Sequence, residues 1–234
     1  MMPEAQNPNA QMLAAAVEKL VPLLDRIVFV GGCATGLLIT DPGASPVRPT
    51  LDVDAIIDLA SYAQFADLEN RLQDLGFQPS HAEGAPICRW THQDLVLDLM
   101  PTDSSILGFS NRWYHMALQN SETTRIGTHK IRLITAPYFL ATKLEALHGR
   151  GQHDYRLSRD LEDIVTVING RPEIVNEVQE TEDRLRQYLS DQLSTLLADR
   201  NFMEALPGHL LPDAASQQRL RIVLHRIEQI AQKG

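Results

Sequence analysis

Residues 48–60, RPTLDVDAIIDLA, decide how this chain is interpreted. The leucine, valine and isoleucine residues of this stretch are typical of a strand that enters a hydrophobic core. Asp52, Asp54 and Asp58 lie among them, although a carboxylate is costly to bury. The acids therefore need an explanation, either structural or chemical.

Strand geometry separates the three acids. Residues two apart in a strand point to the same face, so we expect Asp52 and Asp54 to project side by side while Leu51 and Val53 face the core. Asp58 shares their parity but lies further along, near the expected strand end, and we leave it out of the site. Two adjacent carboxylates repel each other unless a cation lies between them. Mg²⁺ fits, because it prefers oxygen ligands.

A further acid occurs in a second apolar run, QDLVLDLMP, which contains Asp98. If the two strands are neighbours, Asp98 completes a triad with Asp52 and Asp54 that can hold two Mg²⁺ ions, or Mn²⁺, and accept a proton from an attacking hydroxyl. The alternative is that the acids are strand-edge charges that face water and prevent aggregation.

Composition limits the class of protein. The chain has 234 residues, 44% hydrophobic and 22% charged, which indicates a folded protein with a real core. Its net charge of −9 argues against a surface built to grip long nucleic acid. No apolar run or amino-terminal signal pattern predicts a membrane segment or secretion. The separated Cys33 and Cys88 and the scattered histidines predict no disulfide framework and no zinc site, and a cytoplasmic location is expected.

The pattern of elements predicts an α/β (α+β) fold. We expect residues 1–130 to form an α/β core with a small mixed sheet and an amino-terminal helix, and residues 131–234 to form a helical subdomain. In the first part the sequence predicts helices at 11–26, 33–40 and 62–77, and strands at 27–30, near 51–59, twice within 85–101 and at 129–134. In the second part it predicts helices at 138–151, 158–172, 175–200 and 215–232.

Gly31 and Gly32 follow the apolar run IVFV, where a strand is expected to end and a helix to begin. Such a turn lets backbone N–H groups approach a phosphate. A pair of glycines at this position is also typical of a simple tight turn, and the motif is neither GxGxxG nor a Walker A loop.

Taken together, Gly31–Gly32, Asp52-x-Asp54 and Asp98 resemble the nucleotidyltransferase fold of the DNA polymerase β superfamily. The likeness extends over residues 25–172 and is greatest to the AbiEii/AbiGii toxin-like branch. In residues 136–171, a helix lysine followed by an acidic D-x-x-D is similar to carboxy-terminal motifs of that branch. Two features depart from the superfamily: Gly32 stands where a serine is usual, and the gap between Gly32 and Asp52 is long.

The resemblance implies a catalytic and metal-binding set of Asp52, Asp54 and Asp98. It also implies a nucleotide pocket completed by the helical subdomain, with Gly31, Gly32 and Lys143 near the phosphates and Asp160 and Asp163 in support. Thr35 is the residue that could replace the missing serine hydroxyl. The implied reaction transfers NMP from an NTP such as ATP to an acceptor hydroxyl, on an RNA 3′ end or a protein. The same likeness implies that the chain is a toxin with a cognate antitoxin as partner. It implies no membrane partner.

Other interpretations stay open at this stage. The chain could modify an antibiotic or another small molecule, or be a catalytically idle nucleotide-binding module. Lys143 lies within the apolar stripe of its helix, where it needs an anionic partner unless it extends to solvent at the rim. Asp160 and Asp163 could simply complement a helix dipole. The segment GFSNRWYHM could stack on a base or pack as a loop, and the basic residues Arg219, Arg221 and Arg226 could line an RNA path or flank a packed helix.

Overall fold

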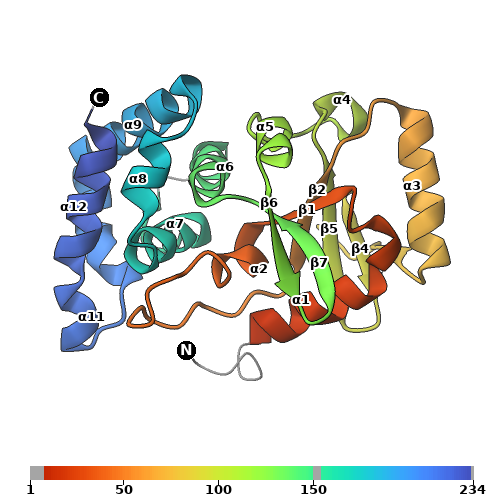
Figure 1. Cartoon of the computed structure of the whole chain (residues 1–234), viewed down its shortest axis with the longest axis horizontal. Coiled ribbons are helices and arrows are strands. Elements are labelled where there is room, and N and C mark those ends of the chain that lie inside the picture. Colours follow the sequence, from red (N-terminus) through yellow and green to blue (C-terminus); the bar gives the residue numbers. More distant parts are fainter. Residues whose placement is uncertain (1–7, 150–153, 233–234) are drawn as a thin grey trace. The chain divides into compact units, whose positions relative to one another are not determined.

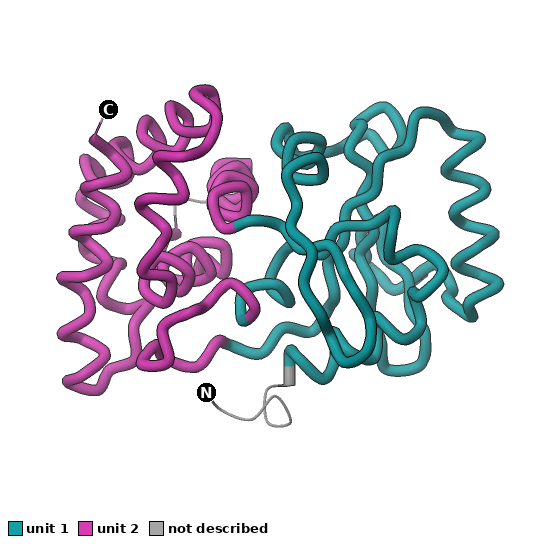
Figure 2. The backbone as a smooth tube through the Cα atoms, in the orientation of Figure 1, with its two compact units in different colours: residues 1–36, 48–135 teal, residues 37–47, 136–234 magenta. Residues whose placement is uncertain are grey.

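The computed structural model describes residues 8–149 and 154–232. The chain divides into two compact units (Figure 2). Unit 1 comprises Met1–Gly36 and Arg48–Thr135, and unit 2 comprises Leu37–Val47 and Ala136–Gly234. The backbone therefore leaves unit 1 after the predicted glycine turn and returns to it just before the acidic strand.

Unit 1 is built on a mixed seven-stranded sheet with the order β3-β4-β5-β2-β1-β7-β6 (Figure 1). The β2–β5 and β1–β7 pairs are parallel, and the other neighbours are antiparallel. The strands are β1 (Ile27–Val30), β2 (Val53–Ile57), β3 (Gln78–Pro79), β4 (Arg89–His92), β5 (Leu95–Pro101), β6 (Glu122–Ile126) and β7 (His129–Leu133). The mixed sheet with helices confirms the predicted fold class.

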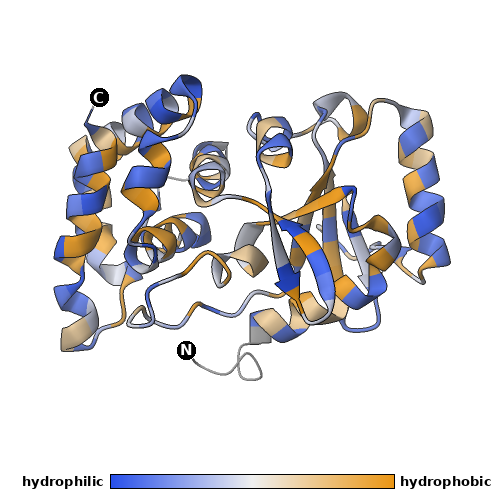
Figure 3. Ribbon diagram, viewed as in Figure 1, coloured by the Kyte–Doolittle hydropathy of each residue, from blue (hydrophilic) through white to orange (hydrophobic). Residues whose placement is uncertain are grey.

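Six helical segments accompany this sheet among the described residues. They are α1 (Pro8–Lys19), the 3₁₀ turn η2 (Val21–Leu23), α2 (Gly31–Thr35), α3 (Tyr62–Asp74), α4 (Ser104–Leu107) and α5 (Tyr114–Gln119). Helix α1 packs against β2, β5, β6 and β7, and Figure 3 shows the central strands to be largely hydrophobic. Helix α3 begins at Ser61, whose hydroxyl accepts a hydrogen bond from the Gln64 N–H, and ends before Gly76 at φ +87°.

Two expectations for unit 1 are wrong. Leu51 is 76% exposed rather than buried, because β2 begins only at Val53. Between the expected strands that end at residue 101 and begin at residue 129 the sequence predicts only loop, but α4, α5 and β6 lie there, and β6 pairs with β7 through a turn at Gly127. Short helices and a polar strand carry little periodicity, so the sequence pattern does not reveal them.

Unit 2 is a helical bundle joined by the segment Leu37–Val47 (Figure 2). Helix α6 packs on α7, α8 and α9, and helix α12 packs on α7, α8 and α9. The helical segments are α6 (Ala136–Gly149), α7 (Arg159–Gly170), α8 (Ile174–Gln179), α9 (Asp183–Ala198), α10 (Arg200–Ala205), η3 (Leu206–His209), α11 (Ala214–Gln218) and α12 (Leu220–Ala231). The expected single helix at 175–200 is thus two helices, and the expected helix at 215–232 is also divided.

The segment Leu37–Val47 explains the long gap between Gly32 and Asp52. The N–H groups of Thr40 and Asp41 donate hydrogen bonds to the carbonyl oxygen of Gly170 at 3.0 and 2.9 Å. Arg219 forms an ion pair with Asp41. The extra residues therefore pack on the helical bundle rather than lengthen a loop of the sheet unit.

Throughout the described residues, every helix is too short or too polar to cross a membrane.

Candidate functional site

The parallel pairing of β2 and β5 brings two of the predicted acids together. In the register of these strands, Asp54 lies opposite Asp98. Their strand neighbours Val53 and Leu97 are fully buried, so the core fixes both backbones. Asp98 itself is only 7% exposed. The prediction that the two acidic strands are neighbours in the sheet is confirmed.

Asp52 precedes β2 and joins the same cluster through an arginine. One Arg89 nitrogen, Nη2, donates to Asp52 Oδ2 at 2.8 Å and to Asp98 Oδ2 at 2.7 Å. Arg89 Nε donates to Asp98 Oδ1 at 2.8 Å, so the guanidinium holds both oxygens of Asp98. The hydroxyl of Thr50 donates to the second oxygen of Asp52 at 3.0 Å. The hydrogen bonds from Arg89 to Asp98 raise the pKa of Arg89 further above its usual value, so the arginine is permanently charged.

Sequence reasoning missed Arg89, although a signal was present. Strands β4 and β5 form an antiparallel hairpin in which His92 pairs with Leu95, so Gln93 and Asp94 form its two-residue turn. That register places Arg89 directly opposite Asp98. The sequence predicts instead that the polar residues 91–94, THQD, join the two strands. A four-residue joint gives a different register, in which Arg89 is not opposite Asp98.

The acidic cluster matches Mg²⁺ in its chemistry but not in its present arrangement. Three carboxylates supply the oxygen donors that Mg²⁺ prefers. However, among residues 8–149 and 154–232 no three His, Cys, Asp or Glu side chains are placed to hold a metal ion together. The Arg89 guanidinium lies between Asp52 and Asp98, where a shared cation would be bound. A metal ion fits this donor set only if the guanidinium moves.

The two glycines have different structural roles. Gly31 adopts φ +65°, and a Cβ atom at this position would lie 1.9 Å from Asp54 Oδ2. A side chain at residue 31 is therefore excluded by both the backbone and the Asp54 carboxylate. At Gly32 a Cβ atom would lie 3.2 Å from the Thr50 hydroxyl oxygen, which is a close but milder contact. Gly31 thus makes room for an acid of the cluster.

Thr35 lies at the end of the short helix α2 and is fully buried. Its hydroxyl oxygen has no hydrogen-bond partner among the described residues. As the residue stands its hydroxyl does not reach solvent, so the predicted phosphate contact would require a change of conformation.

The predicted helix lysine lies in unit 2 beside both predicted aspartates. Lys143 Nζ is 3.2 Å from Asp160 Oδ1 and 2.7 Å from Asp163 Oδ2. The side chains of Lys143, Asp160 and Asp163 are 12%, 5% and 2% exposed. The anionic partners that a buried lysine needs are therefore these two carboxylates. Asp160 and Asp163 do more than complement the dipole of α7, because they pair with Lys143.

The other segments considered from the sequence have structural partners. Trp113 is 2% exposed, and the Tyr114 hydroxyl donates to Met100 Sδ at 3.2 Å, so this segment is packed, and its last residues begin helix α5. Both cysteines are buried, and burial raises the pKa of Cys88 to about 12, so its thiol is unsuited to be a nucleophile.

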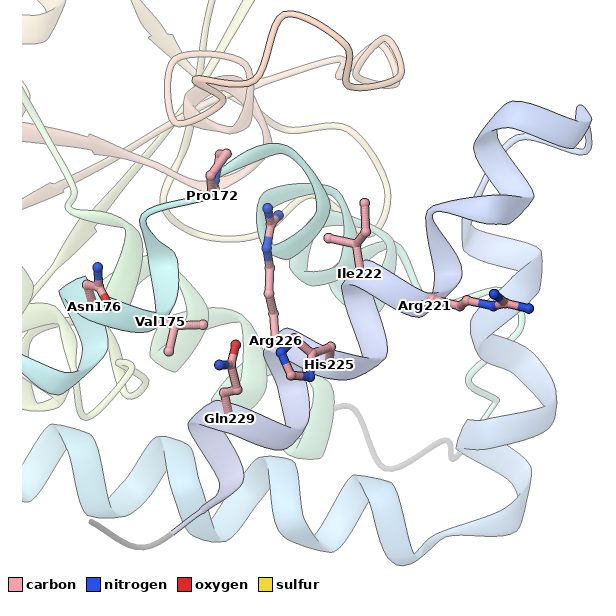
Figure 4. A pocket seen from close by; sticks show the side chains of 8 residues that line it. All are labelled: Pro172, Val175, Asn176, Arg221, Ile222, His225, Arg226 and Gln229. Atoms are coloured by element: carbon pink, nitrogen blue, oxygen red, sulfur yellow. The ribbon is translucent and has the colours of Figure 1, made fainter.

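The basic residues of α12 are divided between packing and a cavity. Arg219 and Arg226 donate to the Asn169 carbonyl oxygen at 2.9 and 2.8 Å. A cavity of about 600 Å³ in unit 2 is lined by Arg221 and Arg226 (Figure 4). The described residues that line it are Pro172, Val175, Asn176, Arg221, Ile222, His225, Arg226 and Gln229. None of these residues belongs to the predicted site.

Two solved structures that the chain resembles are described as a nucleotidyltransferase-like protein and a putative nucleotidyltransferase. The chain matches an antigenic nucleotidyltransferase-like protein from Paracoccidioides brasiliensis with a TM-score of 0.52 and 20% identity, over 86% of this chain and 94% of that one. It matches a putative nucleotidyltransferase from H. pylori with a TM-score of 0.50 and 14% identity, over 98% of this chain and 96% of that one. JHP933 from Helicobacter pylori matches with a TM-score of 0.48 and 16% identity, over 95% of this chain and 90% of that one.

No protein-family model and no curated protein matches the sequence. At these identities the structural likeness shows the fold, which is nucleotidyltransferase-like as the motifs predict. The AbiEii/AbiGii branch stays a prediction.

Proposed function

We propose that the chain is a Mg²⁺-dependent nucleotidyltransferase that transfers NMP from an NTP to an acceptor hydroxyl. The observation that carries the proposal is the in-register opposition of Asp54 and Asp98 on two buried parallel strands, with Asp52 joined to Asp98 through Arg89. Burying carboxylates at these positions costs free energy of folding. In a nucleotidyltransferase-like fold, the proposed metal binding gives these acids a function.

Each acid has a role in the proposed reaction. Asp54 and Asp98, together with Asp52, would hold the metal through carboxylate oxygens. When bound, Mg²⁺ would neutralise phosphate charge and favour deprotonation of the attacking hydroxyl. Asp98 would accept the proton of that hydroxyl. The acceptor oxygen then bonds to the α-phosphorus, the bond from this phosphorus to the leaving oxygen breaks, and pyrophosphate departs.

The proposed phosphate contact of Lys143 faces a competitor in its own unit. Asp160 and Asp163 already neutralise this lysine, so a triphosphate would have to attract it away from two carboxylates. We therefore assign the three residues first to the stability of the helical unit. A direct phosphate contact of Lys143 remains a prediction that nucleotide binding by a Lys143 variant can test.

The acceptor and the biological role are proposed from the sequence resemblance. An RNA 3′ end or a protein hydroxyl is the proposed acceptor, and a toxin with a cognate antitoxin is the proposed role. A toxin should inhibit growth when expressed, and its Asp54→Asn variant should not.

A catalytically idle binding module is the second candidate, and one observation favours it. The guanidinium of Arg89 occupies the place between Asp52 and Asp98 that a shared metal would take. If this arrangement is permanent, the acids are structural partners of an arginine and no transfer occurs.

Transfer of label distinguishes the two candidates. The purified chain is incubated with each α-³²P-NTP and Mg²⁺ or Mn²⁺, and with total RNA, protein or small acceptors. Asp54→Asn and Asp98→Asn keep the size of each side chain and remove its charge. Asp67→Asn, in an exposed ion pair with Arg71, is the matched control. We expect label with wild type and the control and none with the two site variants. Equal labelling by all four proteins would refute the proposed site, and no labelling with any acceptor would favour the binding module.

A further inference from the structure

Arg89 has the position of a bound cation rather than of an ordinary surface charge. A single nitrogen, Nη2, lies within 2.8 Å of an oxygen of Asp52 and of an oxygen of Asp98. A cation shared between two carboxylates has this arrangement. The arginine side chain comes from β4, the strand next to β5, and is held there by the backbone pairing of Arg89 with Asp98.

The pairing of Arg89 involves two of the three acids, Asp52 and Asp98. A divalent ion between these two carboxylates would carry twice the charge of the guanidinium and would attract both more strongly. This difference in charge favours exchange of the guanidinium for a divalent ion.

The arginine is also able to leave. Its side chain is 28% exposed, whereas that of Asp98 is 10% exposed. The guanidinium ends a long side chain that can rotate into solvent, so its departure need not disturb the buried strands β2 and β5. The carboxylates remain fixed while their cation changes.

Resting on the proposed function, we infer that Arg89 is the resident counterion of the metal-free cluster and that a divalent metal must displace it to bind between Asp52 and Asp98. Arg89 thereby lowers the affinity of the site for metal and preserves the cluster when metal is absent. It is a positioning residue, because it acts through the two carboxylates.

Direct metal binding tests the inference without any measurement of activity. Mn²⁺ binding is followed by electron paramagnetic resonance for wild type, Arg89→Gln and the control Arg71→Gln, whose ion pair with Asp67 is exposed. A charge-assisted hydrogen-bonded pair that must be broken is expected to weaken binding by roughly tenfold. Arg89→Gln should therefore bind Mn²⁺ about tenfold more tightly than wild type, and the control should bind like wild type.

Thermal unfolding supplies a second measurement on the same proteins. Without metal, Arg89→Gln should melt below wild type because it loses the ion pairs of Arg89 with Asp52 and Asp98. Saturating Mn²⁺ should raise its melting temperature more than that of wild type. If Arg89→Gln does not fold, the wild-type Arg89 Nε–H signal is followed by NMR. Mg²⁺ should remove its protection from exchange with water, and persistent protection at saturating Mg²⁺ would overturn the inference.

Failure of the inference and failure of the proposed function give different results. Equal Mn²⁺ affinity of wild type and Arg89→Gln, with nucleotidyl transfer by wild type, overturns the inference alone. Tighter binding by Arg89→Gln without transfer by either protein supports the inference and refutes the proposed function. Absence of Mn²⁺ binding by both proteins refutes both.

Discussion

Replacement of Lys143 by methionine is the most decisive test of the helical unit. Methionine matches the length and helix propensity of lysine but removes the charge that neutralises Asp160 and Asp163. These two side chains are 5% and 2% exposed, so water cannot take the place of the lysine. The variant therefore removes the ammonium group that pairs with both buried carboxylates.

The size of the effect follows from the loss of one partner of a buried ion pair. Such a loss typically costs about 3–5 kcal/mol of unfolding free energy. We therefore expect Lys143→Met to lower the free energy of unfolding by about 4 kcal/mol at pH 7.

Removal of the two carboxylates tests the cause of the loss. The triple variant in which Asp160 and Asp163 are also asparagine should regain much of the stability at pH 7.

Urea denaturation measures this prediction with two probes. Trp90 and Trp113, the two tryptophans of the chain, both lie in unit 1, so their fluorescence follows unit 1, while circular dichroism at 222 nm is dominated by helices. Lys143→Met should shift the dichroism transition strongly. Arg71→Met removes a pair whose side chains are 51% and 56% exposed, and should change stability by less than about 1 kcal/mol. If Lys143→Met is as stable as wild type, the lysine does not neutralise these acids, and its assignment to stability is wrong.

Three other substitutions have equally definite expectations. Gly31→Ala should cost about 1–3 kcal/mol in urea denaturation and abolish label transfer, because φ is positive and the new Cβ meets Asp54. Gly32→Ala should be far milder in both measurements, and similar losses in both variants would contradict the assigned roles. Hydrogen bonding from Arg219 lowers the pKa of Asp41, so the pair stabilises the fold above the unfolded pKa near 3.9 and loses this effect as pH falls through the folded-state pKa. Asp41→Asn should therefore show a flatter loss of unfolding free energy between pH 5 and 2 than wild type, and an unchanged slope would refute the coupling.

Local pattern was sufficient to predict much of the sheet unit. The strand at β2 followed from apolar residues around the acids, and the pairing of Asp54 with Asp98 followed once β5 was placed beside it. Helix α3 followed from its amphipathic pattern and from Gly76 at its end, and in unit 2 helix α7 followed from the capping residue Ser158. In each of these elements one buried face and a recognisable end occur together, which is why the sequence pattern was sufficient.

The features that escaped prediction depend on contacts between distant residues. Leu51 has the parity of a core residue, but β2 begins after it, and no local signal distinguishes the two cases. The interval between α8 and α9 contains Glu180 and Glu182, which are good helix formers, so the break reflects packing rather than propensity. The sequence predicts a helix to residue 40 and a loop after it, whereas α2 ends at Thr35 and the segment Leu37–Val47 packs on unit 2. Its partners Gly170 and Arg219 lie more than a hundred residues away, so no local pattern reveals them.

Arg89 shows how a single register decides the interpretation of the site. With the hairpin turn at Gln93 and Asp94, Arg89 faces Asp98, and a shift by one residue would send the arginine to the opposite face of the sheet. The acids alone predict a metal site, whereas the acids with Arg89 describe a cluster whose cation is already present. Arg89, a residue of strand β4, donates hydrogen bonds to both Asp52 and Asp98. The strength of this pairing therefore decides whether the acids of residues 48–60 can bind a metal ion.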